Sequence, residues 1–286
     1  MKLVTQDYGC GTSSSILDYG VTDVVIVSES NFNHVFEVED DLLFIGHDFL
    51  FFLWDNEEKL KKWHARKDKW EHWVWCFERI DAIVPAWQQK SHYSLKLAST
   101  FCKRILACDE DDCDKYGLDW LPQWASPRFF HEKTPLPHSE KFLFSGQAGK
   151  PEYQMRNKLL EEINSDPVIG KDLIVSNVSR DLGWDKYIIN LMEHRNILNP
   201  VGILRGLNTR AYETLYSGRV LLQHSAGEYK RHEKLLKDNT GALFFRDVSM
   251  LKEHLKNVLK VETNSILSYT ESSIFVRMKS IGIEIK

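Results

Sequence analysis

The segment 187–222 contains several side chains suited to binding an anionic ligand. Asn199 ends a short apolar strand candidate, and a loop containing Arg205 follows it. The next helix carries Arg210 and Glu213, which are three residues apart and therefore lie on one helical face near its start. An arginine there suits a phosphate, because unpaired backbone N–H groups and the helix dipole add to its positive charge. A surface ion pair between Arg210 and Glu213 would also explain the spacing.

A second phosphate-binding candidate lies upstream, where a strand candidate runs into a loop with two glycines. The sequence Phe142-Leu-Phe-Ser-Gly-Gln-Ala-Gly149 places Ser145, Gly146 and Gln147 shortly before a predicted helix. A strand, a glycine-containing turn and a helix N-terminus together present backbone N–H groups to an anion. Arg156, one turn into that helix, could reach a diphosphate. A tight turn without any ligand is the alternative explanation of this pattern.

The fold of the second half must position these residues. Its sequence alternates short apolar runs, typical of strands, with segments of helical period. We predict strands at 142–145, 173–175, 197–199, 220–223 and 243–245, and helices at 154–163, 185–193, 209–216, 228–236 and 249–259. Such alternation is typical of a parallel sheet covered by helices, as in a Rossmann-like unit.

The first half also alternates, but it is unusual in holding eight of the nine tryptophans, between Trp54 and Trp124. We predict strands at 3–5, 23–27, 42–45, 82–85 and 104–107, and a helix of about 25 residues at 57–79. Apolar residues at spacings of three, four or seven place most of the helix's tryptophans in the core. Trp75 falls off that apolar face, which makes it a candidate to stack on an acceptor.

Length and composition favour two α/β domains. The chain has 286 residues, with 41 acidic and 37 basic side chains and 43% hydrophobic residues, as expected of a globular protein. Prolines between 120 and 137 disfavour helix there and mark the connection between the halves. We predict one Rossmann-like domain at 1–130, a second at 138–262, and a C-terminal segment at 263–286 that packs back on the first domain.

Several protein classes are excluded by the same survey. The longest apolar run, 42–54, is broken by His47 and Asp48 and is shorter than the ~18–20 residues of a membrane span. The N-terminus lacks the apolar core of a signal peptide, so we expect a cytoplasmic protein. Five cysteines without C-x-x-C spacing predict neither a disulfide framework nor a zinc site. A net charge of −4 argues against a dedicated nucleic-acid binder.

The pattern of residues from 197 to 222 resembles a known family. Ile197-Leu-Asn-Pro200, Arg210-Ala-Tyr-Glu213, Gly218 and Leu221-Leu222 match the C-terminal segment of the glycosyltransferases related to spore maturation. These are a subgroup of the retaining glycosyltransferases of the GT-B fold, also called glycosyltransferase group 1. The stretches at 120–127, at 144–149 with Arg156, and at 243–251 resemble the same family.

This resemblance implies two Rossmann-like domains facing each other across a cleft, with the acceptor on the first and a nucleoside diphosphate sugar, UDP or GDP, on the second. Breaking the bond to the diphosphate develops negative charge, which arginines and helix N-termini can stabilise without a metal ion or another cofactor. The implied catalytic residues are Arg156, Arg205 and Arg210. The implied donor-binding residues are Ser145, Gly146, Gln147, Tyr187, Asn199 and Glu213, with Glu213 accepting hydrogen bonds from the ribose.

One departure from the family pattern keeps other functions open. The larger family has two glutamates separated by seven residues, whereas the position eight before Glu213 holds Arg205. We expect a hexosyltransferase acting on a glycan or another surface-polymer precursor. A DNA-modifying glycosyltransferase and a non-catalytic nucleotide- or glycan-binding protein of the same fold are the alternatives.

The first half offers candidates for contacts with the sugar or the acceptor. Gly11 lies in a glycine- and serine-rich turn, and His47 and Asp48 follow the strand candidate at 42–45. A capped turn and a core or surface histidine are the simpler explanations. The basic run from Lys59 to Lys69 is typical of a solvated face, although DNA or an anionic membrane surface could also bind it.

The acidic quartet Asp109–Asp112 has two explanations. A D-x-D pattern after a strand can bind Mn²⁺ or Mg²⁺ through its hard oxygen ligands. The same residues can instead cap a solvated helix, which is the interpretation we favour.

Overall fold

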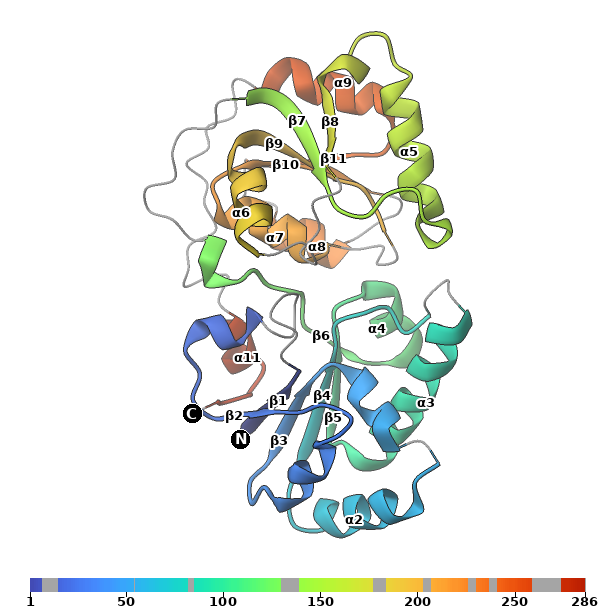
Figure 1. Cartoon of the computed structure of the whole chain (residues 1–286), viewed down its shortest axis with the longest axis vertical. Coiled ribbons are helices and arrows are strands. Elements are labelled where there is room, and N and C mark those ends of the chain that lie inside the picture. The colour runs from blue at the N-terminus through green and yellow to red at the C-terminus, as the bar shows by residue number, and fades with distance from the viewer. Residues whose placement is uncertain are drawn as a thin grey trace. The chain divides into compact units, whose positions relative to one another are not determined.

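The computed structural model describes residues 1–6, 15–53, 55–81, 85–129, 139–176, 184–202, 207–225, 230–236, 241–258 and 274–285. The chain divides into two compact units, one formed by Met1–Gln123 with Ser273–Lys286 and the other by Trp124–Ser272. Each is an α/β unit built on a parallel sheet, which confirms the predicted fold class (Figure 1). Within the described ranges, no helix is both long and apolar enough to cross a bilayer.

The sheet of the first unit has six parallel strands in the order β2-β1-β3-β4-β5-β6. The strands are β1 Lys2–Thr5, β2 Val24–Ile26, β3 Leu42–Ile45, β4 His72–Cys76, β5 Arg104–Ala107 and β6 Asp119–Trp120. All residues of β3 and β4 are buried. This burial is typical of central parallel strands, which are covered on both faces.

The helices of the first unit are α2 Glu57–Lys67, α3 Pro85–Phe101, α4 Glu110–Tyr116 and α11 Ile274–Ser280, with 3₁₀ turns η1 Leu17–Tyr19, η2 Phe32–Glu37 and η3 His47–Leu53. The Asn56 side chain accepts a hydrogen bond from Lys59 N at the start of α2. α3 begins with a proline, which needs no hydrogen-bond partner for its nitrogen. The C-terminal α11 belongs to this unit, where Phe275 packs edge-on against Tyr19.

The predicted long helix at 57–79 is wrong. The helix ends at Lys67, and His72–Cys76 forms β4 between β3 and β5. Aromatic and β-branched side chains favour a strand once neighbouring strands can pair with it, so tertiary context overrode the helical period. Trp75 is therefore fully buried and donates to Leu121 O at 2.8 Å, which removes it as an acceptor platform. Of the predicted strand at 82–85, Pro85 instead begins α3, and residues 82–84 lie outside the described ranges.

The second unit follows its predicted pattern closely. Its five parallel strands, in the order β11-β10-β9-β7-β8, are β7 Ser139–Ser145, β8 Leu173–Ser176, β9 His194–Asn199, β10 Val220–His224 and β11 Ala242–Phe245. Its helices are α5 Gln154–Asn164, α6 Trp184–Met192, α7 Thr209–Tyr216, α8 Lys230–Leu235 and α9 Val248–Asn257, with 3₁₀ turns η4 Pro127–Phe129, η5 Pro151–Tyr153 and η6 Gly170–Asp172. All five predicted strands are present.

The order of these strands defines where a ligand should bind. From β7 the chain first adds β8 on one side and then returns to add β9 on the other. Helices α5 and α9 share one face of the sheet with Phe142 and Phe144, and α6, α7 and α8 lie on the opposite face (Figure 1). In open parallel sheets, ligands bind outside the carboxyl ends of the strands at such a reversal. That point lies between the ends of β7 and β9.

Candidate functional site

Two arginines meet over one aromatic ring at the carboxyl end of β7. Arg156, from the first turn of α5, has its Cζ 5.5 Å from the centroid of the Phe144 ring. Arg210, from the first turn of α7, has its Cζ 5.1 Å from the same centroid. A ring face attracts a guanidinium electrostatically, so Phe144 can hold both cations at one place. The site therefore carries two positive charges on a shared support.

Glycines leave the room that these two guanidinium groups occupy. Gly146 has φ +150°, and a Cβ at this position would collide with Arg210 Nη2. A Cβ at Gly202 would collide with Arg156 Nη2 in the same way. Any larger residue at either position would force a cation out of its place. The two glycines are thus explained by the close approach of the arginines.

Within the described residues, no carboxylate balances the positive charges of this site. Arg156 is buried, and among the described residues neither Arg156 nor Arg210 forms an ion pair. The Nε atoms of both arginines are buried and have no hydrogen-bond partner in that part of the chain. Burial and the nearby charge of Arg210 lower the pKa of Arg156, although Tyr153 opposes the shift. Because a buried cation is costly without a partner, the arrangement favours an anionic ligand.

Backbone and amide groups complete the surroundings of the arginine pair. Arg156 Nη1 donates to Gln147 O at 2.8 Å, and its guanidinium also stacks on the Tyr153 ring at 4.3 Å. Arg210 Nη1 donates to Asn199 Oδ1 at 3.0 Å. Ser145 Oγ accepts a hydrogen bond from Asn190 Nδ2 at 3.2 Å. The loop after β7 and the end of β9 therefore both contribute to this region.

A carboxylate on α7, the helix that carries Arg210, is held in the interior. Glu213 on α7 is fully buried, and its Oε2 accepts a 2.7 Å hydrogen bond from the hydroxyl of Tyr187 on α6. The Tyr187 ring packs edge-on against Phe129, with the centroids 6.0 Å apart. Glu213 is thus oriented by a neighbouring helix and is not in the surface ion pair with Arg210 that its spacing allowed.

The structure brings together most of the residues predicted for the second half. Gly146, Gln147, Arg156, Asn199 and Arg210 share the region around Phe144, whereas Tyr187 and Glu213 form their own buried pair. Their roles toward a nucleotide stay predictions. Arg205 lies outside the described residues.

Three neighbours of the site escaped the sequence analysis. They are Phe144, Gly202 and Gln223. Phe144 stands two residues before the glycine of a strand-turn-helix pattern, and Gly202 follows Asn199 by three. A glycine at position 202 is consistent with close approach of a neighbouring group. Gln223 has no such sequence signal, because its role depends on the pairing of β10 with β9.

The candidates of the first unit are placed differently. His47 is buried in η3, its Nε2 is 2.9 Å from Ser91 Oγ, and burial lowers its pKa to about 4. This environment matches the simpler explanation of a core histidine. Gly11 and the side chain of Asp48 lie outside the described residues. Within the basic run, Arg66 is buried and donates to Val38 O and Asp40 O, so it does not contribute to a basic surface.

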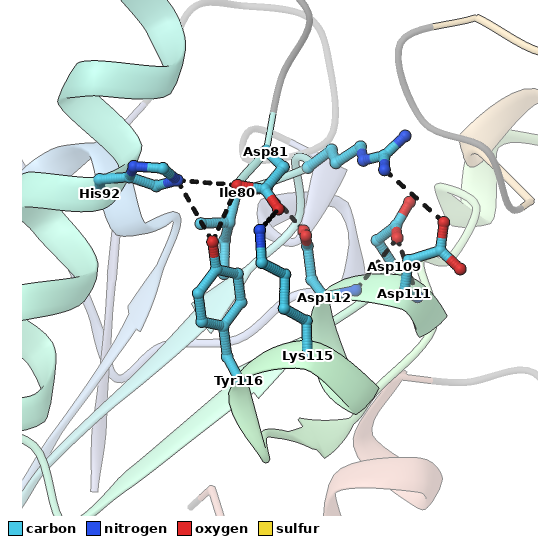
Figure 2. Close-up of polar contacts among 9 residues, drawn as sticks. Ile80, Asp81, His92, Asp109, Asp111, Asp112, Lys115 and Tyr116 are labelled. Atoms are coloured by element: carbon cyan, nitrogen blue, oxygen red, sulfur yellow. Dashed lines mark hydrogen bonds and ion pairs between the residues drawn. The ribbon is translucent and has the colours of Figure 1, made fainter.

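The acidic quartet caps a helix. Asp109 accepts hydrogen bonds from Asp111 N at 3.1 Å and Asp112 N at 3.3 Å at the start of α4 (Figure 2). Asp112 Oδ2 accepts from Ile80 N at 2.5 Å. No group of three or more histidine, cysteine, aspartate or glutamate side chains suited to a metal ion occurs in the described ranges. The contacts match a helix cap, but the expected solvation is wrong, because Asp109, Glu110 and Asp112 are buried.

A neighbouring polar cluster links α3 to α4. Asp81 lies 2.8 Å from His92 Nε2, accepts a 2.8 Å hydrogen bond from the Tyr116 hydroxyl and pairs with Lys115 (Figure 2). Burial opposes ionisation of Asp81, but the hydrogen bonds from Lys115, His92 and Tyr116 outweigh it and lower its pKa. With three donors on one carboxylate, the cluster ties the two helices together.

The chain is similar to solved structures but matches no protein-family model or curated protein. Among solved structures, the chain is similar to alpha,alpha-trehalose 6-phosphate synthase from Burkholderia multivorans, with 11% sequence identity and a TM-score of 0.46. The similarity covers 88% of this chain and 70% of that chain.

Proposed function

We propose that this protein is a glycosyltransferase of the GT-B type that moves a sugar from a UDP-sugar or GDP-sugar to an acceptor. The observation that carries the proposal is the arginine pair over Phe144, which has no carboxylate partner in the described residues and lies where the strand order reverses. A diphosphate is the ligand chemistry that two adjacent guanidinium groups suit best.

In this proposal the second unit binds the donor. Arg156 and Arg210 contact the diphosphate, and the loop residues Ser145 to Gln147 approach it. During transfer the bond between the anomeric carbon and the diphosphate oxygen breaks, and its electron pair stays on the diphosphate. The acceptor oxygen forms the new bond to carbon, and its proton passes to the departing diphosphate. The arginines stabilise the charge that develops on the leaving group, so the step needs no metal ion or other cofactor.

The acceptor is assigned to the first unit by analogy with the family resemblance. A glycan or another surface-polymer precursor is the proposed acceptor, with DNA as the alternative. Lys59, Lys61 and Lys62 on α2 could support contact with a polyanion or an anionic membrane surface. Cytoplasmic location belongs to the same proposal.

The proposal is tested by binding and turnover in the presence of EDTA. We expect UDP or GDP, their sugars and pyrophosphate to raise the melting temperature at millimolar concentration, and Arg156→Gln to abolish the shift. Chromatography should then show slow hydrolysis of the bound nucleotide sugar. Absence of any stabilisation by these ligands would refute the donor site.

One observation favours a second candidate function. The position eight before Glu213 holds Arg205, so the first carboxylate of the family pattern is missing. A non-catalytic protein that binds a nucleotide or a nucleotide sugar would fit this departure. Binding without hydrolysis or transfer for any donor and acceptor would establish this second function.

A further inference from the structure

Behind Arg210 lies a chain of three directed hydrogen bonds that ends on the backbone. Gln223 Nε2 donates to His224 O at 2.8 Å. Gln223 Oε1 accepts from Asn199 Nδ2 at 2.7 Å, and Asn199 Oδ1 accepts from Arg210 Nη1 at 3.0 Å. Asn199 and Gln223 are both buried and are direct partners in the pairing of β9 with β10. The two amides therefore face each other on the same side of the sheet.

The orientation of the Gln223 and Asn199 amides is fixed by the His224 carbonyl at the end of this hydrogen-bond series. The His224 carbonyl can only accept, so it requires the NH₂ group of Gln223. The Gln223 oxygen must then face Asn199 and requires its NH₂ group. Only the Asn199 oxygen remains to face Arg210, and that is the atom a guanidinium needs, because arginine is purely a donor. A reversed Asn199 would instead present its own donors to the cation.

We propose that Gln223 is a positioning residue of the donor site, which fixes the amide of Asn199 so that its oxygen holds the Arg210 guanidinium in place for the diphosphate. This inference rests on the proposed function, since it assigns Gln223 a task toward the same anion. Gln223 acts only through Asn199 and is not expected to touch the ligand. The Phe144 ring contacts the face of the Arg210 guanidinium, and Asn199 Oδ1 accepts a hydrogen bond from one of its edges.

The test is a double-mutant cycle on pyrophosphate affinity, measured by calorimetry on the full chain. In Gln223→Met the side chain keeps its length but neither donates nor accepts, so Asn199 can reverse. Loss of one oriented hydrogen bond to a cation should weaken pyrophosphate binding by about 10-fold. Asn199→Ala should weaken it to a similar degree. Because Gln223 acts through Asn199, the double variant should bind no more weakly than Asn199→Ala alone.

A control separates positioning from general damage to the sheet. Asn196 on β9 is also fully buried, and its Nδ2 donates to Glu140 O at 2.9 Å. It is three residues before Asn199 and so points to the other face of the sheet. Asn196→Ala should lower the melting temperature without changing pyrophosphate affinity.

A second variant keeps the proposal testable if Gln223→Met does not fold. The carboxyl group of Gln223→Glu, kept neutral by burial at low pH, has a hydroxyl for His224 O and an oxygen for Asn199. Relative to wild type at the same pH, this variant should bind pyrophosphate normally at pH 5.5. It should bind more weakly at pH 8.5, where ionisation removes the donor.

The outcomes distinguish the two proposals from each other. If wild type binds neither pyrophosphate nor a nucleoside diphosphate, the proposed function fails. If wild type binds but the effects of Gln223→Met and Asn199→Ala add in the double variant, or Gln223→Met behaves like Asn196→Ala, the positioning role is overturned. If Gln223→Met does not fold and Gln223→Glu follows wild type at every pH, the positioning role is likewise overturned.

Discussion

Arg156 and Arg210 stack on one and the same ring, that of Phe144, with their Cζ atoms 5.5 and 5.1 Å from its centroid. Two like charges at such close quarters repel each other, and no carboxylate among the described residues pairs with either of them. The free protein therefore holds an unfavourable arrangement that an anion would relieve. Sites of this kind trade stability for binding.

The first prediction concerns Arg210→Gln. The variant should weaken pyrophosphate binding by about 10- to 100-fold, because a hydrogen bond to a charged group contributes roughly 1.5–3 kcal/mol. Its melting temperature without ligand should stay the same or rise, since repulsion with Arg156 disappears. Calorimetry and thermal melts measure the two effects.

Arg219 provides the control for this prediction. It is also buried in the second unit, but its Nε and Nη2 donate to Met192 O at the end of α6. Arg219→Gln should lower the melting temperature and leave pyrophosphate affinity unchanged. Equal affinities of wild type and Arg210→Gln would remove Arg210 from the anion site.

The second prediction concerns the ring itself. Phe144→Leu keeps an apolar core residue but removes the surface on which both guanidinium groups stack, each contact being worth about 0.5–2 kcal/mol. Pyrophosphate affinity should fall by about 5- to 10-fold. Phe142→Leu, two residues earlier on the same face of β7, is the matched control. Both variants should be less stable, and equal loss of affinity in both would contradict a specific role for Phe144.

The second unit could be predicted well because its local signals agree with its tertiary structure. Each apolar run lies between a turn and a helix with its own period, and Thr209–Tyr216 is observed with its predicted limits. In the first unit the signals conflicted. Leu60, Trp63, Trp70, Val74 and Phe77 share a helical period by coincidence, and Val74 lies instead in a strand that only its pairing with β3 and β5 reveals.

The candidate site shows the same division between local and long-range information. Arg156 and Arg210 could be found because each stands at a helix start next to a glycine-containing loop. Gln223 could not, because its partner Asn199 comes opposite it only through the register of β9 and β10. The contact of both arginines with the Phe144 ring likewise could not be predicted, because it depends on how α5 and α7 pack against the sheet. Periodicity carries no information on such distances between elements.

The third prediction concerns pH. Burial, with the charge of Asp109, raises the pKa of Asp112 to about 6, against hydrogen bonding from Ile80 N and the charge of Arg79. The folded state thus binds more protons than the unfolded state between about pH 4 and 6, so this carboxyl group makes the free energy of unfolding fall as pH rises through that window.

Asp112→Asn tests this relation, because the amide oxygen can still accept from Ile80 N while the charge is lost. The variant should be more stable than wild type at pH 7.5, by about 1–3 kcal/mol, and the difference should vanish near pH 4. Urea unfolding of both proteins at several pH values measures it. A difference that is constant with pH would show that Asp112 titrates normally.

The fourth prediction separates recognition of the nucleoside from that of the diphosphate. Glu213 is held by the Tyr187 hydroxyl at 2.7 Å and is proposed to accept hydrogen bonds from the ribose. In Glu213→Gln the side chain can still accept from Tyr187, but its bonds to a ribose become neutral and weaker. UDP affinity should fall by about 5- to 10-fold relative to wild type, whereas pyrophosphate, which has no ribose, should bind equally well to both.

Tyr187→Phe keeps the ring against Phe129 but removes the hydroxyl that orients the Glu213 carboxylate, so it should show the same selective loss of UDP affinity. Parallel losses for UDP and pyrophosphate would instead place Glu213 in support of the arginine pair, and unchanged UDP binding would remove it from the donor site.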